Sequence, residues 1–360
     1  MSLHIFTCEP GWESVLSDEL GRIFPDAARR QLAPGWVESR WRQEPALSEP
    51  CVAFASQCLP CSERLAAPSV SQWARKAGGW LLETLRDHDG PWRLHVFCVP
   101  LPGGPVRPAR ARLIEQAVLE LLRKKQRRLL RSRVVEPAPP WDDDEALVQI
   151  GLMNAEEGFG SAALPPLRRR LRRCVSRFPG GQVQVAADSA APSRAFAKLA
   201  EVQIRLARSI APGERCVDLG SSPGSWAYLA LRQGAQVTAI DRSPLRGDLM
   251  QHAKLNFVRG DAFRYQPPPA VDWLLCDVIA FPARTIELLE RWIERRWCRW
   301  FCTTVKFKGQ DDYARLEELK TWLEGASVDF FVRRLTSNKN EAMAFGRLRE
   351  AGEAAWEAGQ

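Results

Sequence analysis

The sequence predicts two parts, an α+β region at residues 1–180 followed by an α/β domain at residues 190–360. The second part alternates short apolar strands with helices, as expected for an open, doubly wound sheet. Seven strands are expected, at residues 215–219, 236–240, 257–258, 273–277, 300–305, 328–335 and 342–348. A glycine-rich turn follows the first of these strands, which is where such sheets bind ligands.

That turn runs from Gly220 to Gly224 and leads into a helix. A strand, a glycine turn and a helix in this order place a small ligand at the helix N-terminus. A dinucleotide fingerprint would need a glycine where Ser222 stands, so a nicotinamide dehydrogenase is disfavoured. With Asp218 inside the strand end, the turn suits S-adenosylmethionine better than a pyrophosphate. A structural turn without a ligand is the alternative.

Composition limits the class of protein. The chain has 360 residues, 45% of them hydrophobic, which indicates a globular protein of two or three domains. A net charge of +8 favours a polyanionic partner. The ten cysteines are scattered, as in a reduced cytoplasmic protein, and Cys58-Leu-Pro-Cys61 lacks the second pair that a zinc site needs. We therefore expect no metal. No segment is long enough to span a membrane, so we also expect no membrane partner.

The N-terminal region contains several regular elements and two arginine-rich segments. Strands are expected at residues 3–8, 92–99 and 147–153, a helix at 12–24, and a less regular region from Pro34 onward; two subdomains near 1–60 and 61–180 are possible. A turn is expected at 100–105. A long helix at 107–133 holds ten Lys or Arg, and residues 168–173 hold five arginines. We interpret both segments as a phosphate-binding face; a solvated basic helix is the alternative.

Polar residues stand at the ends of five successive strands of the C-terminal part. They are Asp218, Asp241, Asp261, Asp277 and Lys306. A single aspartate at a strand end is usually a cap or a turn residue, but five polar ends in a row indicate a site. Asp241 lies about twenty residues beyond the glycine turn, where an acid binds the two hydroxyls of a ribose. Asp261 is placed for an adenine amino group.

Asp277, Lys306 and Lys198 suit a reaction at a ribose hydroxyl. A hydroxyl is a weak nucleophile, so a base must remove its proton as it attacks a methyl group. A lysine that lies beside another cation in a poorly solvated pocket loses its proton more readily than one in water. The sulfonium of S-adenosylmethionine brings its own leaving group, so neither a metal nor a covalent intermediate is required. An exposed lysine at a strand end is the alternative for Lys306.

Four segments resemble the FtsJ-type ribose 2′-O-methyltransferases, and more closely the bacterial family called RlmM. They are Pro192-Ser-Arg-Ala-Phe-Ala-Lys-Leu-Ala-Glu201, Asp218-Leu-Gly-Ser-Ser-Pro-Gly-Ser-Trp226, Trp273-Leu-Leu-Cys-Asp277 and Val305-Lys306. The opening Cys8-Glu-Pro-Gly-Trp12 is similar to the start of that family. The resemblance implies a Rossmann-like, seven-stranded domain that uses S-adenosylmethionine. It also implies a THUMP-like, ferredoxin-like RNA-binding region in the N-terminal half.

The resemblance implies roles for particular residues. The catalytic set would be Lys198, Asp277, Lys306 and Glu341, with Lys306 as the proton acceptor. The cofactor would be bound by Ser193, Asp218, Gly220, Ser222, Pro223, Gly224, Ser225, Asp241, Asp261 and Asp277. The implied substrate is one cytidine of 23S ribosomal RNA, as naked RNA or an early assembly intermediate. A monomeric protein is expected.

The chain departs from the family at two points. The family's Cys-Pro-Gly-Gly turn is here Ser222-Pro-Gly-Ser225, and Ala195 stands where a serine is common. We expect cofactor binding to survive both changes. Two alternatives to the function remain, namely the same chemistry on another RNA such as transfer RNA, and a catalytically silent RNA-binding assembly factor. The presence of Lys198, Asp277 and Lys306 disfavours the silent factor, since a binding module does not need them.

Overall fold

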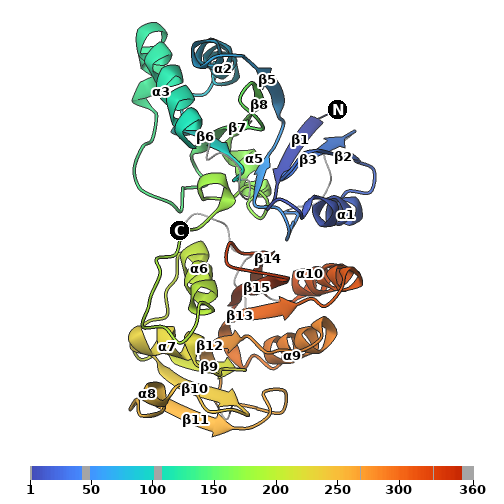
Figure 1. Cartoon of the computed structure of the whole chain (residues 1–360), viewed down its shortest axis with the longest axis vertical. Coiled ribbons are helices and arrows are strands. Elements are labelled where there is room, and N and C mark those ends of the chain that lie inside the picture. The colour runs from blue at the N-terminus through green and yellow to red at the C-terminus, as the bar shows by residue number, and fades with distance from the viewer. Residues whose placement is uncertain (1, 43–48, 101–107, 268, 327, 351–360) are drawn as a thin grey trace. The chain divides into compact units, whose positions relative to one another are not determined.

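The computed structural model describes residues 2–42, 49–100, 108–267, 269–326 and 328–350 (Figure 1). The chain divides into two compact units, the first comprising Met1–Gln182 and the second beginning at Val183. Each unit has its own sheets and its own buried core. The turn expected at 100–105, apart from Pro100, and the first residue of the expected basic helix, Arg107, lie outside the described residues.

In its described residues, the N-terminal unit contains eight strands in two four-stranded sheets, with helices packed against them. The strands are β1 (Ser2–Thr7), β2 (Ala28–Ala33), β3 (Trp36–Trp41), β4 (Gln57–Leu59), β5 (Glu63–Ala66), β6 (Trp92–Cys98), β7 (Ala146–Leu152) and β8 (Glu157–Ala163). The helices are α1 (Glu13–Ile23), α2 (Val70–Thr84), α3 (Pro108–Lys125), α4 (Arg127–Arg131), α5 (Pro165–Arg170) and the 3₁₀ helix η1 (Pro179–Gly181).

The first sheet has the order β2-β3-β1-β4 and is antiparallel throughout. Buried carboxylates hold its connections. Glu19 of α1 accepts the backbone N–H groups of Ala53 and Phe54 at 2.7 and 2.9 Å. Glu13 accepts the N–H of Gly35, in the turn between β2 and β3, at 2.5 Å. Because a buried carboxylate is costly unless it is hydrogen-bonded, these contacts secure the path of the loops.

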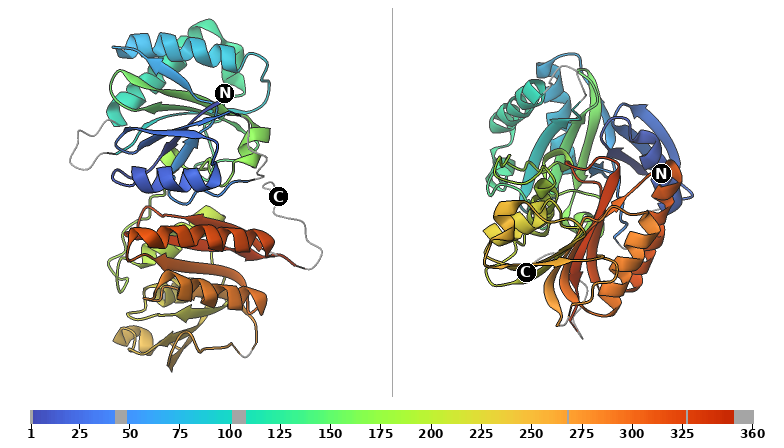
Figure 2. Two further views of the ribbon diagram at one scale, coloured as in Figure 1. Left: turned by 90° about the vertical axis from the view of Figure 1, so that its right-hand side faces the viewer. Right: turned by 60° about the horizontal axis from the view of Figure 1, so that its bottom comes forward.

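The second sheet has the order β5-β8-β7-β6, with β6 and β7 parallel and the other pairs antiparallel. Helices α2 and α3 lie side by side against it (Figures 1 and 2). Apolar residues of both helices pack with the sheet into one buried cluster that includes Trp73, Trp92, Ile114 and Val118. The sheet therefore buries one face under two helices.

The C-terminal unit is built on one seven-stranded sheet. Its strands are β9 (Arg215–Leu219), β10 (Gln236–Asp241), β11 (Leu255–Arg259), β12 (Val271–Cys276), β13 (Cys298–Lys306), β14 (Val328–Arg333) and β15 (Glu341–Leu348). Its helices are α6 (Phe196–Leu206), α7 (Ser225–Arg232), α8 (Gly247–Met250), α9 (Pro282–Glu294), α10 (Arg315–Gly325) and the 3₁₀ helix η2 (Gln310–Ala314).

The sheet order is β11-β10-β9-β12-β13-β15-β14. Strand β15 alone runs in the direction opposite to the other six strands. Helices α6 and α7 cover one face, while α9 and α10 cover the other (Figure 1). The antiparallel register pairs Lys306 with Glu341. The first residue of β15 therefore lies at the edge where the parallel strands end, which is the edge that binds ligands in open α/β sheets.

The predicted fold class is confirmed. The C-terminal unit has the seven-stranded, mostly parallel sheet with helices on both faces, and the N-terminal unit mixes helices with mostly antiparallel strands. All seven expected strands of the C-terminal sheet are present, each within a few residues of the predicted bounds. Within the described residues, no helix is both long enough and apolar enough to cross a bilayer.

The prediction of an irregular region after Pro34 is wrong. This part of the chain contains β3, β4, β5 and α2. Strand β3 buries almost every residue, including Glu38 and Ser39, so its sequence shows no alternation of polar and apolar positions. Helix α2 did have a readable start, since the Ser69 hydroxyl caps it by accepting the N–H of Gln72. Strand β8 was also not predicted; its run of Gly and Ala lacks the branched side chains typical of strands.

The two arginine-rich segments differ in the structure. The expected helix at 107–133 is interrupted at Gln126, whose φ of −149° and ψ of 68° are not helical, so it forms α3 and α4. The second segment is mostly internal, contrary to its interpretation as a phosphate-binding face. Arg168 is fully buried beside Asp143, and both Arg172 and Arg173 pair with Glu49. A guanidinium that neutralises a carboxylate inside the unit is not presented to RNA.

His4 in β1 makes the N-terminal unit sensitive to acid. Its ring is buried and stacks on Trp41 with 3.6 Å between the ring centroids. Burial, with a smaller contribution from Arg170, lowers the pKa of His4 from 6.5 to about 3. Between these values only the unfolded chain binds the proton, so the free energy of unfolding falls as the pH drops below 6.5. We expect His4→Phe, which keeps a ring against Trp41, to remove this dependence.

The measurement is urea unfolding of the full chain followed by tryptophan fluorescence, from neutral to mildly acidic pH. The wild type should lose up to about 1.4 kcal/mol per pH unit relative to His4→Phe. The matched control is His88→Phe, a change at a partly exposed position of the same unit, which should follow the wild type. Parallel stability curves for the wild type and His4→Phe would contradict the prediction.

Candidate active site

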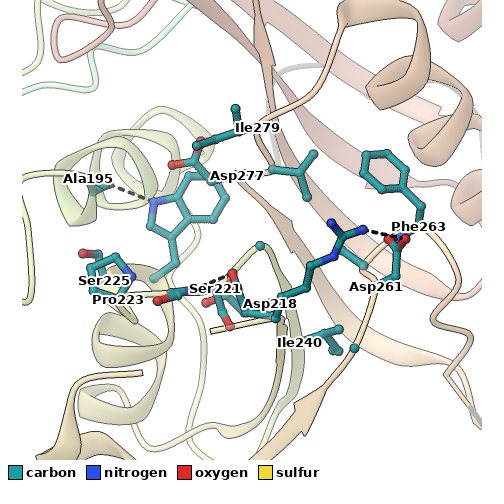
Figure 3. A pocket seen from close by; sticks show the side chains of 18 of the residues that line it. Ala195, Asp218, Ser221, Pro223, Ser225, Ile240, Asp261, Phe263, Asp277 and Ile279 are labelled. Atoms are coloured by element: carbon teal, nitrogen blue, oxygen red, sulfur yellow. Dashed lines mark hydrogen bonds and ion pairs between the residues drawn. The ribbon is translucent and has the colours of Figure 1, made fainter. Parts of the chain in front are cut away.

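A pocket of about 470 Å³ opens where the parallel strands end (Figure 3). Its size lies within the usual range of small-molecule sites. Residues from several strand ends and the following turns line it, namely Ala195, Asp218, Gly220, Ser221, Ser222, Pro223, Ser225, Trp226, Ile240, Asp241, Arg242, Gly260, Asp261, Ala262, Phe263, Asp277, Val278, Ile279, Arg284 and Lys306.

The glycine turn is possible only with glycine at its two ends. Gly220 and Gly224 have φ angles of +73° and +106°, which side chains with a Cβ rarely adopt. A Cβ on Gly220 would lie 2.9 Å from the Cα of Val278, and one on Gly224 would lie 2.5 Å from a methyl group of Leu249. Gly224 is also the N-cap of α7. The turn therefore brings the backbone close to both the next strand end and the helix start.

Asp218 forms part of the pocket floor. Its side chain is buried, and Oδ2 accepts the backbone N–H of Ala227 in the first turn of α7 at 3.0 Å. Burial raises the pKa of Asp218 to about 8; the hydrogen bond from Ala227 opposes this effect, while the charges of Asp277 and Asp241 add to it. The group is therefore mostly uncharged at neutral pH, and its hydrogen bond fixes the strand end to the helix.

Two further carboxylates lie along the pocket. Asp241 ends β10 and accepts the N–H groups of Ser222 and Ser243 at 3.0 and 2.9 Å. Asp261 accepts the N–H of Phe263 and pairs with Arg242 at 3.0 Å. The hydrogen bond from Phe263 is the main reason that the pKa of Asp261 lies below its usual value. Both carboxylates are thus held in place by backbone donors.

The serines of the turn have different environments. The hydroxyls of Ser193 and Ser225 lie 2.7 Å apart, which joins the segment before α6 to the start of α7. The Ser222 hydroxyl donates to the carbonyl of Pro244 at 3.0 Å. Ala195 has no hydroxyl, unlike the serine expected at this position. Its backbone carbonyl accepts the indole N–H of Trp226 at 2.8 Å. The backbone thus keeps one polar contact at this position.

The four predicted catalytic residues form one connected cluster. Lys306 Nζ lies 2.9 Å from Oδ1 of Asp277 and donates to the carbonyl of Asp277, also at 2.9 Å. Lys198 Nζ lies 3.3 Å from Oδ2 of Asp277 and 2.8 Å from Oε1 of Glu341. Two ammonium groups thus share two carboxylates, and Asp277 bridges both lysines. The side chains come from α6, the loop after β12, and the strands β13 and β15.

The two lysines differ in their access to the pocket. The side chain of Lys198 is 11% exposed and lies behind Asp277, whereas that of Lys306 is 24% exposed and lines the pocket. Asn338 donates to Glu341 at 3.2 Å and so holds the carboxylate that pairs with Lys198. Lys306 can therefore reach a bound molecule, while Lys198 and Glu341 support Asp277 from the protein side.

Most of the predicted site residues meet at this pocket. Of the ten residues predicted to bind a cofactor, eight line it, while Ser193 and Gly224 contact residues that do. Sequence reasoning missed Trp226, Arg242, Phe263 and Arg284 as lining residues. The guanidinium of Arg284 lies 3.8 Å from the ring centroid of Phe263. A signal existed for Phe263, which follows Asp261 closely, but none for Arg284 in the first turn of α9.

Across the residues that the structure describes, no group of three or more His, Cys, Asp or Glu side chains could hold a metal ion. Cys58 is buried in β4 and Cys61 is exposed.

The close approach at Gly220 gives a testable consequence. Gly220→Ala would force a left-handed conformation that costs about 1–2 kcal/mol and would press the new methyl group against the backbone of Val278. We expect a loss of at least about 2 kcal/mol in the free energy of unfolding, measured by urea denaturation. The matched control is Gly247→Ala, because a Cβ there meets nothing within 4 Å. Equal stability of the two variants would show that position 220 does not require glycine.

Comparison with known proteins points to one family. The model of a family described as FtsJ-like methyltransferase matches residues 191–299. A protein of Marinomonas sp. (strain MWYL1) named Ribosomal RNA large subunit methyltransferase M is 31% identical over 47% of this chain and 51% of that protein. A protein of the same name from Alkalilimnicola ehrlichii is 27% identical over 90% of this chain and 88% of that protein. For the first relatives, the match spans about half of their length or less.

Among solved structures, one match is TrmN from Thermus thermophilus, which is 17% identical over 97% of this chain and the whole of that chain, with a TM-score of 0.37. A score of this size adds nothing to the sequence relatives. The predicted resemblance rests on those relatives, and it is confirmed. Residues 191–299 match the model of the FtsJ-like methyltransferase family, and the chain is similar in sequence to the proteins named Ribosomal RNA large subunit methyltransferase M.

Proposed function

We propose that this protein transfers a methyl group from S-adenosylmethionine to a ribose 2′-hydroxyl of ribosomal RNA. The observation that supports this most is the cluster of Lys198, Asp277, Lys306 and Glu341 at the inner end of a nucleoside-sized pocket. Such a cluster has no use in a pure binding module. A catalytically silent assembly factor is therefore the weaker reading.

The residues of the pocket fit S-adenosylmethionine. The glycine turn leaves room for close approach of a ligand to the backbone at the start of α7. The carboxylate of Asp241 would bind the ribose hydroxyls, and Asp261 with Phe263 would bind the adenine. Ser222, Ser225 and the neutral Asp218 would face the methionine part. When bound, S-adenosylmethionine supplies an electrophilic methyl group on a sulfonium.

Lys306 is the proposed proton acceptor. Its Nζ is the only amine of the two cluster lysines that lines the pocket, so it can approach a hydroxyl placed there. Once it has lost its own proton to solvent, Lys306 would accept the proton of the 2′-hydroxyl as that oxygen takes the methyl group that bound S-adenosylmethionine would supply. Asp277 then pairs with the ammonium that has formed, at the 2.9 Å separation already present.

Lys198 and Glu341 are proposed to position this pair. Lys198 holds Oδ2 of Asp277, which leaves Oδ1 directed at Lys306. Glu341 balances the charge of Lys198 at 2.8 Å. Removing one partner would leave a partly buried charge uncompensated, so all four residues depend on one another.

The proposed acceptor is 23S ribosomal RNA, as naked RNA or an early assembly intermediate, in the cytoplasm. The names of the relatives support a ribosomal RNA. The N-terminal unit, which we propose to be THUMP-like, presents an exposed basic surface on α3 and α4. This basic surface comprises Arg123, Lys124, Lys125, Arg127, Arg128 and Arg131. We propose that a monomer uses it to hold RNA phosphates.

The test is transfer of label from S-adenosylmethionine to unmodified 23S RNA, with transfer RNA in parallel. Lys306→Ala should lower the rate by about 10²–10⁴-fold, the usual contribution of a general base. Binding of S-adenosylmethionine, measured by calorimetry, should persist, because the other pocket residues remain. Lys306→Arg keeps the positive charge but cannot accept a proton, so it should be equally slow.

Each outcome separates a different part of the proposal. Full activity of Lys306→Ala or Lys306→Arg would exclude Lys306 as the proton acceptor. Label on transfer RNA alone would support methyl transfer but exclude 23S RNA as the substrate. Binding of S-adenosylmethionine without transfer to any RNA would favour the assembly factor.

The basic surface predicts a strong dependence of RNA binding on salt. For single-stranded RNA, the logarithm of affinity falls with the logarithm of salt concentration by about 0.7 per neutralised phosphate. Lys124→Ala combined with Lys125→Ala removes two such contacts and should therefore reduce this slope by about 1.4. The measurement is a filter-binding titration at several salt concentrations.

The matched control is Arg22→Ala combined with Arg30→Ala, which removes two exposed arginines of the same unit outside the basic surface. This variant should keep the slope of the wild type. If the wild-type affinity is insensitive to salt, or if both double variants behave alike, the basic surface is not the RNA-binding surface.

A further inference from the structure

Two large apolar side chains are exposed beside the active site. Ile279 and Phe281, in the loop between β12 and α9, are 89% and 60% exposed. Ile279 also lines the mouth of the pocket, next to Asp277 (Figure 3). Few large apolar side chains of the described residues are this exposed, and these two stand two residues apart. Adjacent exposed apolar groups at a site indicate a binding surface.

Local contacts fix the backbone of Phe281. Phe281 is the N-cap of α9, its carbonyl accepts the N–H of Thr285 at 3.2 Å, and Pro282 restricts its conformation. Phenylalanine makes no side-chain hydrogen bond at this cap, where Ser, Thr, Asp or Asn would stabilise the helix. The ring therefore starts from a fixed backbone position, and neither the helix cap nor the core uses it.

One cation lies over this ring. The Nζ of Lys308 lies 3.8 Å from the ring centroid of Phe281. The backbone N–H of Lys308 donates to Asp312 at 2.7 Å, which holds the residue in place. An exposed aromatic ring next to a cation is the arrangement on which proteins stack the bases of single-stranded nucleic acids.

We propose that Ile279, Phe281 and Lys308 form a stacking platform for an unpaired RNA base next to the nucleotide that is methylated. This proposal rests on the proposed function and specifies how its acceptor is held. The base would lie on the ring of Phe281 and against Ile279, while Lys308 would contact its phosphate. The positive charge of Lys308 favours an RNA over an apolar protein partner.

The location suits a neighbouring nucleotide. Phe281 is four residues after Asp277, so their Cα atoms are at most about 14 Å apart. Lys308 is two residues after Lys306, at the end of the adjacent strand β13. The stacking platform and the cluster therefore belong to the same two strand ends. A base stacked on Phe281 would fix the position of the next ribose relative to Lys306.

The experiment compares binding of a single-stranded oligocytidylate with binding of an abasic ribose-phosphate chain of the same length. Both probes carry the same phosphates, so only the bases differ. For the wild type, we expect tighter binding of the oligocytidylate. Phe281→Ala should weaken oligocytidylate binding by about 5- to 100-fold, the usual effect of losing one stacked base, and should leave the abasic chain unaffected. Phe281→Tyr retains a ring and should bind like the wild type.

The matched control is Met250→Ala, which shortens an exposed apolar side chain elsewhere in the same unit. This variant should change neither the affinity for the oligocytidylate nor the affinity for the abasic chain. With 23S RNA as substrate, Phe281→Ala should raise the KM for RNA with little change in kcat and no change in the affinity for S-adenosylmethionine. A purely structural role would instead lower stability and the affinity for S-adenosylmethionine together.

The binding assay does not require turnover, so it tests the stacking platform even if no RNA is methylated. Absence of transfer by the wild type would refute the proposed function alone. Equal loss of affinity for both probes in Phe281→Ala would refute base stacking. Unchanged binding of the oligocytidylate by Phe281→Ala would show that this surface does not bind RNA.

Discussion

The shared carboxylate of Asp277 is the constraint on which the C-terminal unit depends. It lies between the ammonium groups of Lys198 and Lys306, and Glu341 supplies the second negative charge. Partly buried charges are tolerated only when each is paired. The four residues come from α6, the end of β12, the end of β13 and the start of β15, so the pairing requires the complete sheet order. An error in the order of these strands would leave a charge unpaired.

The glycine turn couples the cofactor side of the pocket to this cluster. Gly220 packs against Val278, the residue next to Asp277, with no space for a side chain. The turn that would contact the methionine part and the loop that carries Asp277 are therefore in direct contact. The same loop continues to Ile279 and Phe281. One short segment thus links the proposed sites of the methyl donor, the proton acceptor and the RNA base.

The basic character of the chain has two separate physical uses. The arginines of α5 and the residues after it neutralise internal carboxylates, as Arg168 does beside Asp143. The cations at 123–131 are instead exposed on α3 and α4. Charge counts do not distinguish these cases, since both segments read as basic runs. Only the exposed cations can exchange their counterions for RNA phosphates.

The C-terminal architecture and its polar strand ends were readable from the sequence. The alternation of strands and helices is local, and parallel strands necessarily end at one edge of the sheet, so Asp241, Asp261, Asp277 and Lys306 could be placed there in advance. Lys198 was grouped with Asp277 and Lys306 from the chemistry that the reaction needs, whereas Glu341 entered the predicted set through the resemblance. Their contacts with Asp277 depend on α6 packing beside the sheet and on the antiparallel register of β15.

Other features were decided by tertiary structure. Strand β3 is buried on both faces and therefore has no periodic pattern, and the helix break at Gln126 has no proline or glycine to mark it. The burial of Arg168 requires Asp143, which lies twenty-five residues earlier in the chain. The exposure of Phe281 beside Lys308 follows from the adjacency of β12 and β13. A sequence specifies which groups each strand end carries, whereas packing between distant segments decides which of them meet.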